Sequence, residues 1–438
     1  MTSNPYGPRF WATWISNTCL MVAVSLLFRY ADFVSSLGGT EDQLGMITGI
    51  GMVGAIVSRC FLGVAIDRYG AGRVWALSLL LLATCLLGHL TVRSLQPPLI
   101  HALRIAYTIS LAGAFGASIT FVSLRAPPDR MGEMIGMLGS SGFVGMAIGP
   151  AIGDWLFAGA GDAIVSRLFY CSSLSAIVAL VFAWMATARV RPVGASSRQS
   201  TVEPVAATAT DHDAATADDA NTSTDERDAA LRRNPLPVNP LRLVRQYHPG
   251  WTLLVGMAMG FGIGMPGTFL SAFAAEKHFA DLGWFWIPYA MIAFVVRILT
   301  RRLADRWGTR PTILTGLACI AASMFAYLLV TSEISLLIPA ALGGTAHAFL
   351  FPAAMAEGNQ SFPIEYRGLA TTLMLTMFDL GMLIGQPVFG FTVEWSRLSG
   401  LNGYAVAFSG LAITMILVGV TYVVGKTPPG LAAPGARA

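Results

Sequence analysis

Hydrophobic residues are gathered along this chain into a dozen runs of about 20 residues, separated by short polar segments. A helix of that length crosses the hydrocarbon core of a bilayer. We therefore expect membrane-spanning helices near 10–33, 43–65, 74–93, 98–122, 133–157, 165–187, 250–275, 284–303, 311–331, 335–356, 367–392 and 402–425.

Composition supports a membrane protein. Of the 438 residues, 54% are hydrophobic and 12% are charged, whereas soluble domains carry about 25% charged residues. The five cysteines lie inside the apolar runs without metal-type spacing, which argues against a disulfide framework or a metal site. No phosphate-binding Gly-Lys-Ser/Thr loop, catalytic nucleophile or cofactor motif is found. We predict an all-α membrane protein that is not an enzyme and needs no cofactor or metal.

The distribution of arginine orients the chain. The loops after spans 2, 4, 8 and 10 carry an excess of basic residues, and the alternate loops carry few. Basic loops stay on the cytoplasmic side, so both termini are expected in the cytoplasm of a multi-pass inner (plasma) membrane protein. The first run is too long for a signal-peptide core and is expected to be retained. No basic stripe with interleaved aromatics indicates nucleic-acid binding.

Residues 188–247 interrupt the pattern. They are rich in Ala, Thr, Ser and Asp, with an acidic middle from Glu203 to Asp228. Such a segment buries too little apolar surface to fold alone, so we expect a disordered cytoplasmic linker. It divides the chain into an N-terminal six-helix bundle, 1–187, and a C-terminal six-helix bundle, 248–438.

A charged turn occurs twice, at equivalent places in the two bundles. The first copy has Gly63, Asp67, Arg68, Gly70 and Arg73, and the second has Asp305 and Arg306 with Arg301 in place of the first glycine. Asp305 follows Asp67 by 238 positions (305 − 67). A duplication of this kind predicts twelve transmembrane helices in two bundles related by a pseudo-two-fold axis.

The fifth span of each half repeats a second pattern. Span 5 contains Gly145, Gly149, Pro150 and Gly153, and span 11 answers with Gly385 and Pro387. Glycine permits close helix contact and proline permits bending, so these positions are predicted hinges between the halves.

These residues resemble the major facilitator superfamily over the whole chain except the linker. The Gly63-to-Arg73 turn is similar to the family's signature between helices 2 and 3, which implies a charge lock at the cytoplasmic side. The glycines of span 5 are similar to its helix-5 antiporter motif, although Asp154 stands where a glycine is usual. The resemblance implies a monomeric transporter that moves a small molecule across the bilayer.

The exporter motif of helix 4 is only partly present. Arg104 matches it, but Tyr107 and Thr108 replace the Gln and Gly. By resemblance, Asp32 and Arg104 could couple protons to release, and Arg104 and Tyr107 could contact substrate. The alternative is an Arg29–Asp32 pair, three residues apart on one helix face.

Ionisable residues at bilayer depth are energetically costly, so each one is a candidate functional residue. Asp379 in span 11 and His347 in span 10 are candidate proton carriers, and His347 is also a candidate substrate contact. The alternative for both is a hydrogen-bonded packing residue. Arg59 and Arg297 occupy equivalent positions in the two bundles. Both could hold the cytoplasmic ends of their helices in place. Alternatively, Arg297 could bind an anionic substrate.

We therefore predict a secondary active transporter of a small organic solute that works by alternating access and couples export to protons. Uptake or exchange of an organic anion, such as a monocarboxylate, is the alternative. A membrane sensor of the same fold that does not transport ranks lower, because both charged turns are present and the linker shows no folded domain.

Overall fold

The computed structural model describes residues 6–96, 98–127, 130–157, 164–188, 240–300, 307–363 and 366–425. All regular secondary structure in these ranges is helical. Eleven stretches are long and apolar enough to cross a membrane, and a shorter apolar helix of 17 residues occupies the remaining expected span. The prediction of an all-α, twelve-span architecture is confirmed.

The helices follow the expected runs closely. The N-terminal half contains α1 (Pro8–Leu26), η1 (Leu27–Arg29), α2 (Tyr30–Ser36), α3 (Glu41–Tyr69), α4 (Ala71–Gly88), η2 (His89–Thr91), α5 (Leu99–Ser123), α6 (Met131–Phe157) and α7 (Ile164–Thr187). The C-terminal half contains α9 (Pro240–Tyr247), α10 (Thr252–Glu276), α11 (Gly283–Leu299), α13 (Thr309–Tyr327), η4 (Ile334–Leu336), α14 (Leu337–Gln360), α15 (Arg367–Leu398) and α16 (Gly403–Val424).

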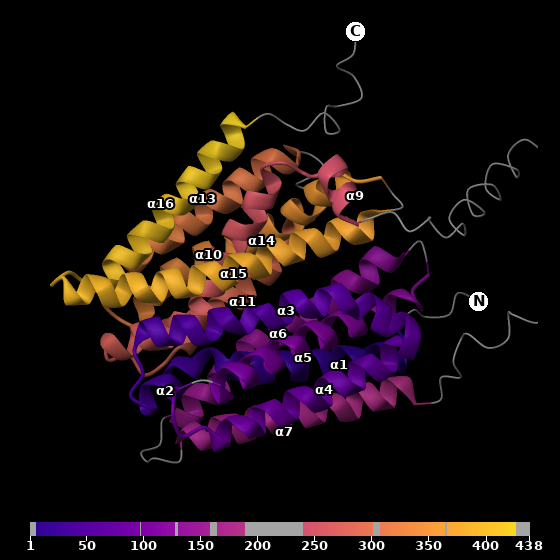
Figure 1. The fold of residues 1–438 in the computed structure, drawn as a ribbon, viewed down its shortest axis with the longest axis horizontal. Helices are drawn as coiled ribbons and strands as arrows, with labels where there is room; N and C mark the ends of the chain where they lie inside the picture. Colours follow the sequence, from indigo (N-terminus) through magenta and orange to yellow (C-terminus); the bar gives the residue numbers. More distant parts are fainter. Residues whose placement is uncertain are drawn as a thin grey trace, which may run out of the picture.

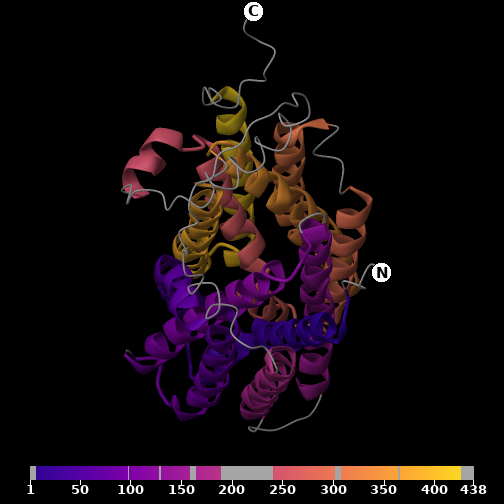
Figure 2. The ribbon, with the colours of Figure 1, turned by 90° about the vertical axis from the view of Figure 1, so that its right-hand side faces the viewer.

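The two sets of helices form two adjoining bundles (Figure 1). We call their boundary the seam. Along it α3 packs on α15, α6 packs on α11, and η1 and α2 pack on α10. We call the end where α1 begins and α16 ends the terminal side, and the opposite end the distal side. Figure 2 views the molecule from the terminal side, with the N-terminal bundle below and the C-terminal bundle above.

The seam is tight at its distal end. A Cβ built on Gly45 of α3 would lie 2.4 Å from the carbonyl oxygen of Gln386, and one on Gly390 of α15 would lie 2.2 Å from that of Glu41. Real Cβ atoms do not approach backbone so closely, so only glycine allows the two halves to meet here. Toward the terminal side, Cβ atoms built on Gly136 and Gly139 of α6 would meet nothing within 4 Å. The halves therefore touch distally and contact each other less toward the terminal side.

The duplicated turn has the same backbone geometry in both halves. Gly70 ends α3 with φ +84°, and Gly308, which follows it by 238 positions (308 − 70), precedes α13 with φ +90°. Side chains rarely adopt that conformation, which explains a glycine at both places. The repeat seen in the sequence is thus also a repeat in structure.

The first span differs from the expected continuous helix at 10–33. Helix α1 ends at Leu26, a 3₁₀ turn follows, and α2 resumes at Tyr30. Two contacts with other elements hold this turn. The Phe28 ring stacks on Trp286 at a centroid distance of 4.0 Å, and the Arg29 side chain bonds to Asp154. Tertiary contacts therefore override the helical pattern here.

Most of the expected linker, residues 189–239, lies outside the described residues, so its disorder stays a prediction. Its last part is helical: α9 spans Pro240–Tyr247 and directly precedes α10. Here the expectation of an unfolded segment differs from the structure, because Leu243 is buried and Tyr247 packs its ring near Phe362.

The tight distal seam predicts that Gly390→Ala opens it. The added methyl must displace the backbone of α3, at a cost of about 1–3 kcal/mol typical of overpacking. We expect a lower thermal unfolding temperature and faster labelling of an Ala31→Cys reporter, a buried position of α2 at the distal end, by a bulky maleimide, measured with the five native cysteines replaced by alanine. Gly410→Ala is the matched control, because a Cβ there meets nothing within 4 Å. Equal behaviour of the two variants would contradict the prediction.

Candidate functional site

A charged pair joins the two halves across the seam. Arg59 of α3 donates from Nε to Asp379 Oδ2 at 2.5 Å and from Nη2 to Asp379 Oδ1 at 3.2 Å. Asp379 lies near the middle of α15 and is 4% exposed, while the side chain of Arg59 is 19% exposed. The two-point contact is the planar geometry that arginine and a carboxylate favour. Asp379 is therefore satisfied by a cation of the opposite half.

Burial makes this pair costly to break. A carboxylate buried at this depth is costly unless it is paired or protonated, and removing one partner of a buried pair typically costs about 3–5 kcal/mol. If the halves separate at this level, the pair must break. Asp379 must then find another cation, meet water or take up a proton.

A second group of side chains lies at mid-seam, and we call it the mid-seam cluster: Phe143 of α6, Tyr289 and Arg297 of α11, and His347 of α14. The Tyr289 hydroxyl and His347 Nδ1 are 3.0 Å apart, and the Phe143 and His347 ring centroids are 5.7 Å apart. The guanidinium carbon of Arg297 lies 5.3 Å from the Phe143 ring centroid. Helices of both halves thus build one aromatic and basic surface.

The mid-seam cluster carries unneutralised positive charge. Within the described ranges, Arg297 has no carboxylate at ion-pair distance, and its charge faces an aromatic ring instead. Arg297 and His347 are both half-buried. Aromatic rings beside an unpaired guanidinium favour a planar organic group that carries negative charge.

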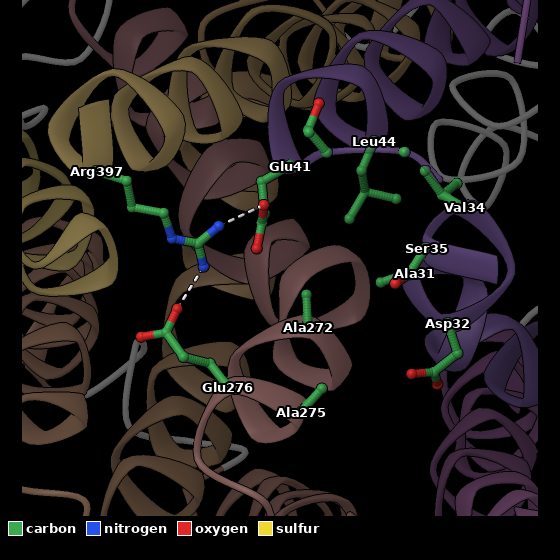
Figure 3. A pocket seen from close by; sticks show the side chains of 12 residues that line it. Ala31, Asp32, Val34, Ser35, Glu41, Leu44, Ala272, Ala275, Glu276 and Arg397 are labelled. Carbon is green, nitrogen blue, oxygen red and sulfur yellow. Dashed lines mark hydrogen bonds and ion pairs between the residues drawn. The ribbon is translucent and has the colours of Figure 1, made fainter. Parts of the chain in front are cut away.

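At the distal end, Arg397 of α15 binds carboxylates of two other helices (Figure 3). It donates from Nη1 to Glu41 of α3 at 2.6 Å and from Nη2 to Glu276 of α10. Glu394 lies 3.7 Å away, and the Tyr404 hydroxyl donates to Glu41 at 3.3 Å. We call this group the Arg397 clasp. It ties α3 of the N-terminal half to α10 and α15 of the C-terminal half.

A small cavity of about 340 Å³ lies beside the Arg397 clasp. Figure 3 shows α2 on one side of it, with Asp32 and Ser35, and α10 on the other, with Ala272 and Ala275. The cavity is lined by elements of both halves, so it lies within the closed distal part of the seam.

A second distal contact is centred on Arg29. Its guanidinium binds Asp154 of α6 and donates to the carbonyl oxygen of Ala280 at 2.6 Å. Asp154 in turn accepts from the backbone N–H of Gly283, at the start of α11, at 2.7 Å. Asp154, which departs from the helix-5 motif, thus joins the N-terminal half to the segment between α10 and α11.

Asp32 and Arg104 are not joined in this structure. Asp32 lies 3.5 Å from Arg29, which is the alternative pairing considered for it. Arg104 is buried between the rings of Tyr30 and Tyr107, at 4.6 and 4.7 Å from their centroids. Its Nε and Nη1 atoms are buried without a hydrogen-bond partner. Arg104 therefore remains a buried cation that aromatic rings, not a carboxylate, stabilise.

The lock residues of the first turn are exposed here, and Arg68 contacts only the ring of its neighbour Tyr69, at 5.5 Å from the centroid, among the described residues. Asp67, Arg68 and Arg73 are exposed, and in the part of the chain that the structure describes Asp67 makes no ion pair. A Cβ on Gly63 would meet nothing within 4 Å. Asp305 and Arg306 lie outside the described residues. A lock at this turn would thus not be engaged in this conformation.

The predicted hinge glycines and prolines lie at helix contacts. Cβ atoms on Gly145 and Gly149 would meet α1 at 2.6 and 2.0 Å, and one on Gly385 would meet Phe261 of α10 at 2.3 Å. Pro387 packs against Gly49 of α3, while Gly153 lies beside Arg29. Both α6 and α15 continue through their prolines, Pro150 and Pro387. These positions allow close packing; their role as hinges stays a prediction.

Sequence reasoning missed several partners. It singled out Arg59 and Asp379 separately but not as a pair, and it gave no role to the clasp residues Glu41, Glu276 and Arg397. Opposite charges on spans 2 and 11 were the available signal, but it does not tell which helices adjoin. Glu357 was also missed: it is buried and accepts from the hydroxyls of Thr252 at 2.9 Å and Tyr422 at 2.5 Å.

Comparisons with known proteins agree with this geometry. A family model described as Major Facilitator Superfamily matches residues 10–385 and 289–438. An uncharacterized MFS-type transporter of Methanocaldococcus jannaschii is 22% identical over 422 residues, 90% of this chain and 94% of that protein. Multidrug resistance protein 1 of Bacillus subtilis is 28% identical over 170 residues, 38% of this chain and 43% of that protein.

Solved structures show the same fold. A D-xylose-proton symporter aligns with a TM-score of 0.73 at 14% identity, covering 97% of this chain and 98% of that one. The nucleoside transporter NupG aligns with a TM-score of 0.69 at 13% identity, covering 95% and 98%. At such identities the likeness concerns the fold alone.

The Arg397 clasp predicts that Arg397→Gln destabilises distal closure. Glu41 and Glu276 would then repel each other across the seam. We expect labelling of the Ala31→Cys reporter to accelerate about fivefold, as for a partly exposed ion-pair network of about 1 kcal/mol. Adding Glu41→Gln and Glu276→Gln should restore slow labelling. Arg93→Gln, an exposed distal arginine, is the control, and an unchanged rate in Arg397→Gln would refute the clasp.

Proposed function

Since the chain belongs to the major facilitator superfamily and is a transporter, not an enzyme, we propose that it is a secondary active transporter which exports a small organic solute in exchange for protons. The observation that carries this proposal is the Arg59–Asp379 pair, a buried ionisable bridge between the two halves. We take 1–187 and 248–438 as the two halves that move against each other.

The asymmetry of the seam supports alternating access. Distally, glycine contacts and two charged contacts hold the halves together, whereas toward the terminal side Cβ atoms built on Gly136 and Gly139 of α6 would meet nothing within 4 Å. With the basic loops and both termini in the cytoplasm, this conformation is closed outside and faces inward. The opposite conformation would release the Arg397 clasp and bring the charged turn of Asp67 and Arg68 into contact.

Asp379 is the proposed site of proton binding. In the structure its carboxylate is neutralised by Arg59. A proton on Asp379 would remove the ion pair and the cost of an unpaired buried carboxylate, so the halves could rearrange. Exchange of that proton for solute on opposite sides of the membrane gives antiport.

The solute is proposed to bind at the mid-seam cluster. Phe143 and Tyr289 offer rings, His347 offers a hydrogen-bonding nitrogen, and Arg297 offers positive charge. An amphipathic solute with a planar part fits these side chains. The unpaired Arg297 also favours a second candidate function, the uptake or exchange of an organic anion.

We expect Asp379→Asn to abolish transport driven by a pH gradient in proteoliposomes. The asparagine amide cannot take up a proton, so a pH gradient can no longer break the contact with Arg59. Exchange of labelled for unlabelled solute at equal pH should persist. The solute is first chosen by a thermal-stabilisation screen of drugs and carboxylates. Glu133→Gln, which removes an exposed carboxylate at the start of α6, is the control. Unchanged pH-driven flux in Asp379→Asn would eliminate the proton role.

We expect Arg297→Gln to weaken binding of an aromatic carboxylate by about tenfold to a hundredfold, the loss of a hydrogen bond to a charged group. Binding of the neutral amide analogue should change little. Thermal stabilisation of the purified protein by each ligand measures both affinities. Arg297→Lys should recover part of the affinity for the carboxylate, because lysine restores the positive charge but lacks the planar guanidinium group that binds both carboxylate oxygens. An equal loss for both ligands would contradict an anion site at Arg297.

A further inference from the structure

Helix α9 has two unlike faces. Leu243 is buried, and one turn later the Tyr247 ring lies 6.0 Å from the Phe362 ring, between α14 and α15. On the other face, Arg242, Arg245 and Gln246 are exposed. The spacing of three and four residues places these polar side chains on one side of the helix. α9 is therefore anchored to the C-terminal half by its apolar face and presents a basic face.

The position of α9 is at the edge of the membrane. It ends at Tyr247, five residues before α10 begins at Thr252. Between them, Trp251 is 45% exposed and packs against Gly425 at the end of α16. A half-exposed tryptophan at a helix end is typical of the membrane–water interface. Figures 1 and 2 show α9 on the outer margin of the C-terminal bundle, at its terminal side.

We propose that α9 lies in the headgroup layer and binds anionic phospholipids through Arg242 and Arg245. Neither arginine has an ion-pair partner among the residues that the structure describes. A guanidinium matches two phosphate oxygens in its plane, and basic residues beside an anionic leaflet are attracted to it. This surface is separate from the mid-seam cluster and does not depend on which solute is carried.

The geometry favours lipid over a soluble anion. The arginines stand beside the apolar residues Val244 and Tyr247 at the margin of the bundle. Acyl chains of a bound lipid would continue along the apolar surfaces of the bundle, which a free phosphate cannot do. The acidic residues between 203 and 228 are the competing occupant by charge.

The test uses the full-length protein in a neutral detergent. Dioctanoyl phosphatidylglycerol and dioctanoyl phosphatidylcholine are titrated separately while thermal unfolding is followed, with glycerol phosphate as the soluble anion. We expect stabilisation by phosphatidylglycerol alone. Arg242→Gln with Arg245→Gln should weaken binding of phosphatidylglycerol about 25-fold, from about fivefold for each arginine. The lipid-free unfolding temperature should be unchanged, since both side chains are exposed.

The matched control is Arg93→Gln with Arg167→Gln, which removes two exposed arginines from the distal side. It should keep the preference for phosphatidylglycerol. The proposal is overturned if the wild-type protein shows no preference, if the α9 variant keeps it, or if the control loses it equally. It is also overturned if glycerol phosphate stabilises as well as the lipid, or if a preference arises only after residues 195–230 are deleted.

Discussion

The cost of a charge inside the bilayer is the constraint on which this structure depends. The chain meets it by pairing charges from different helices: Arg59 with Asp379 near the middle of the seam, Arg397 with Glu41 toward its distal end, and Arg29 with Asp154 within the N-terminal half. The first two pairs join helices that would separate if the halves moved, and the third supports the contacts of Arg29 and Asp154 with the segment between α10 and α11. A charge at the seam is paired in this conformation and would be unpaired if the halves separated.

Glycine decides where the halves can meet. At Gly45 and Gly390 the backbones of α3 and α15 approach so closely that no side chain fits, and the Arg397 clasp lies at the same end. No such close approach occurs at Gly136 and Gly139 of α6, where a built Cβ would meet nothing within 4 Å. Distal contact and terminal-side separation are therefore parts of one rigid-body arrangement. The exposed Asp67 turn belongs to the separated end, which agrees with a lock that forms only when that end closes.

The three surfaces of the molecule have different chemistry. The seam holds ion pairs and the mid-seam cluster, the outer faces of the spans are apolar, and α9 adds a basic surface at the terminal margin. If α10 moved relative to α3, the contacts of the seam would change. Helix α9 would remain joined to the start of α10. Lipid binding at α9 would thus act on a helix that also carries Glu276 of the Arg397 clasp.

The sequence by itself determined the helices, the duplication and the glycine turns. Backbone groups in a bilayer must be satisfied within their own helix, so apolar length alone predicts a span, and φ near +84° at Gly70 is a local requirement. Which charged residues pair with each other follows only from the tertiary structure. Arg59 and Asp379 are 320 residues apart, Asp32 faces Arg29 and not Arg104, and the break at η1 follows from contacts of Phe28 and Arg29. Charge pairing depends on which helices adjoin, and no local pattern contains that information.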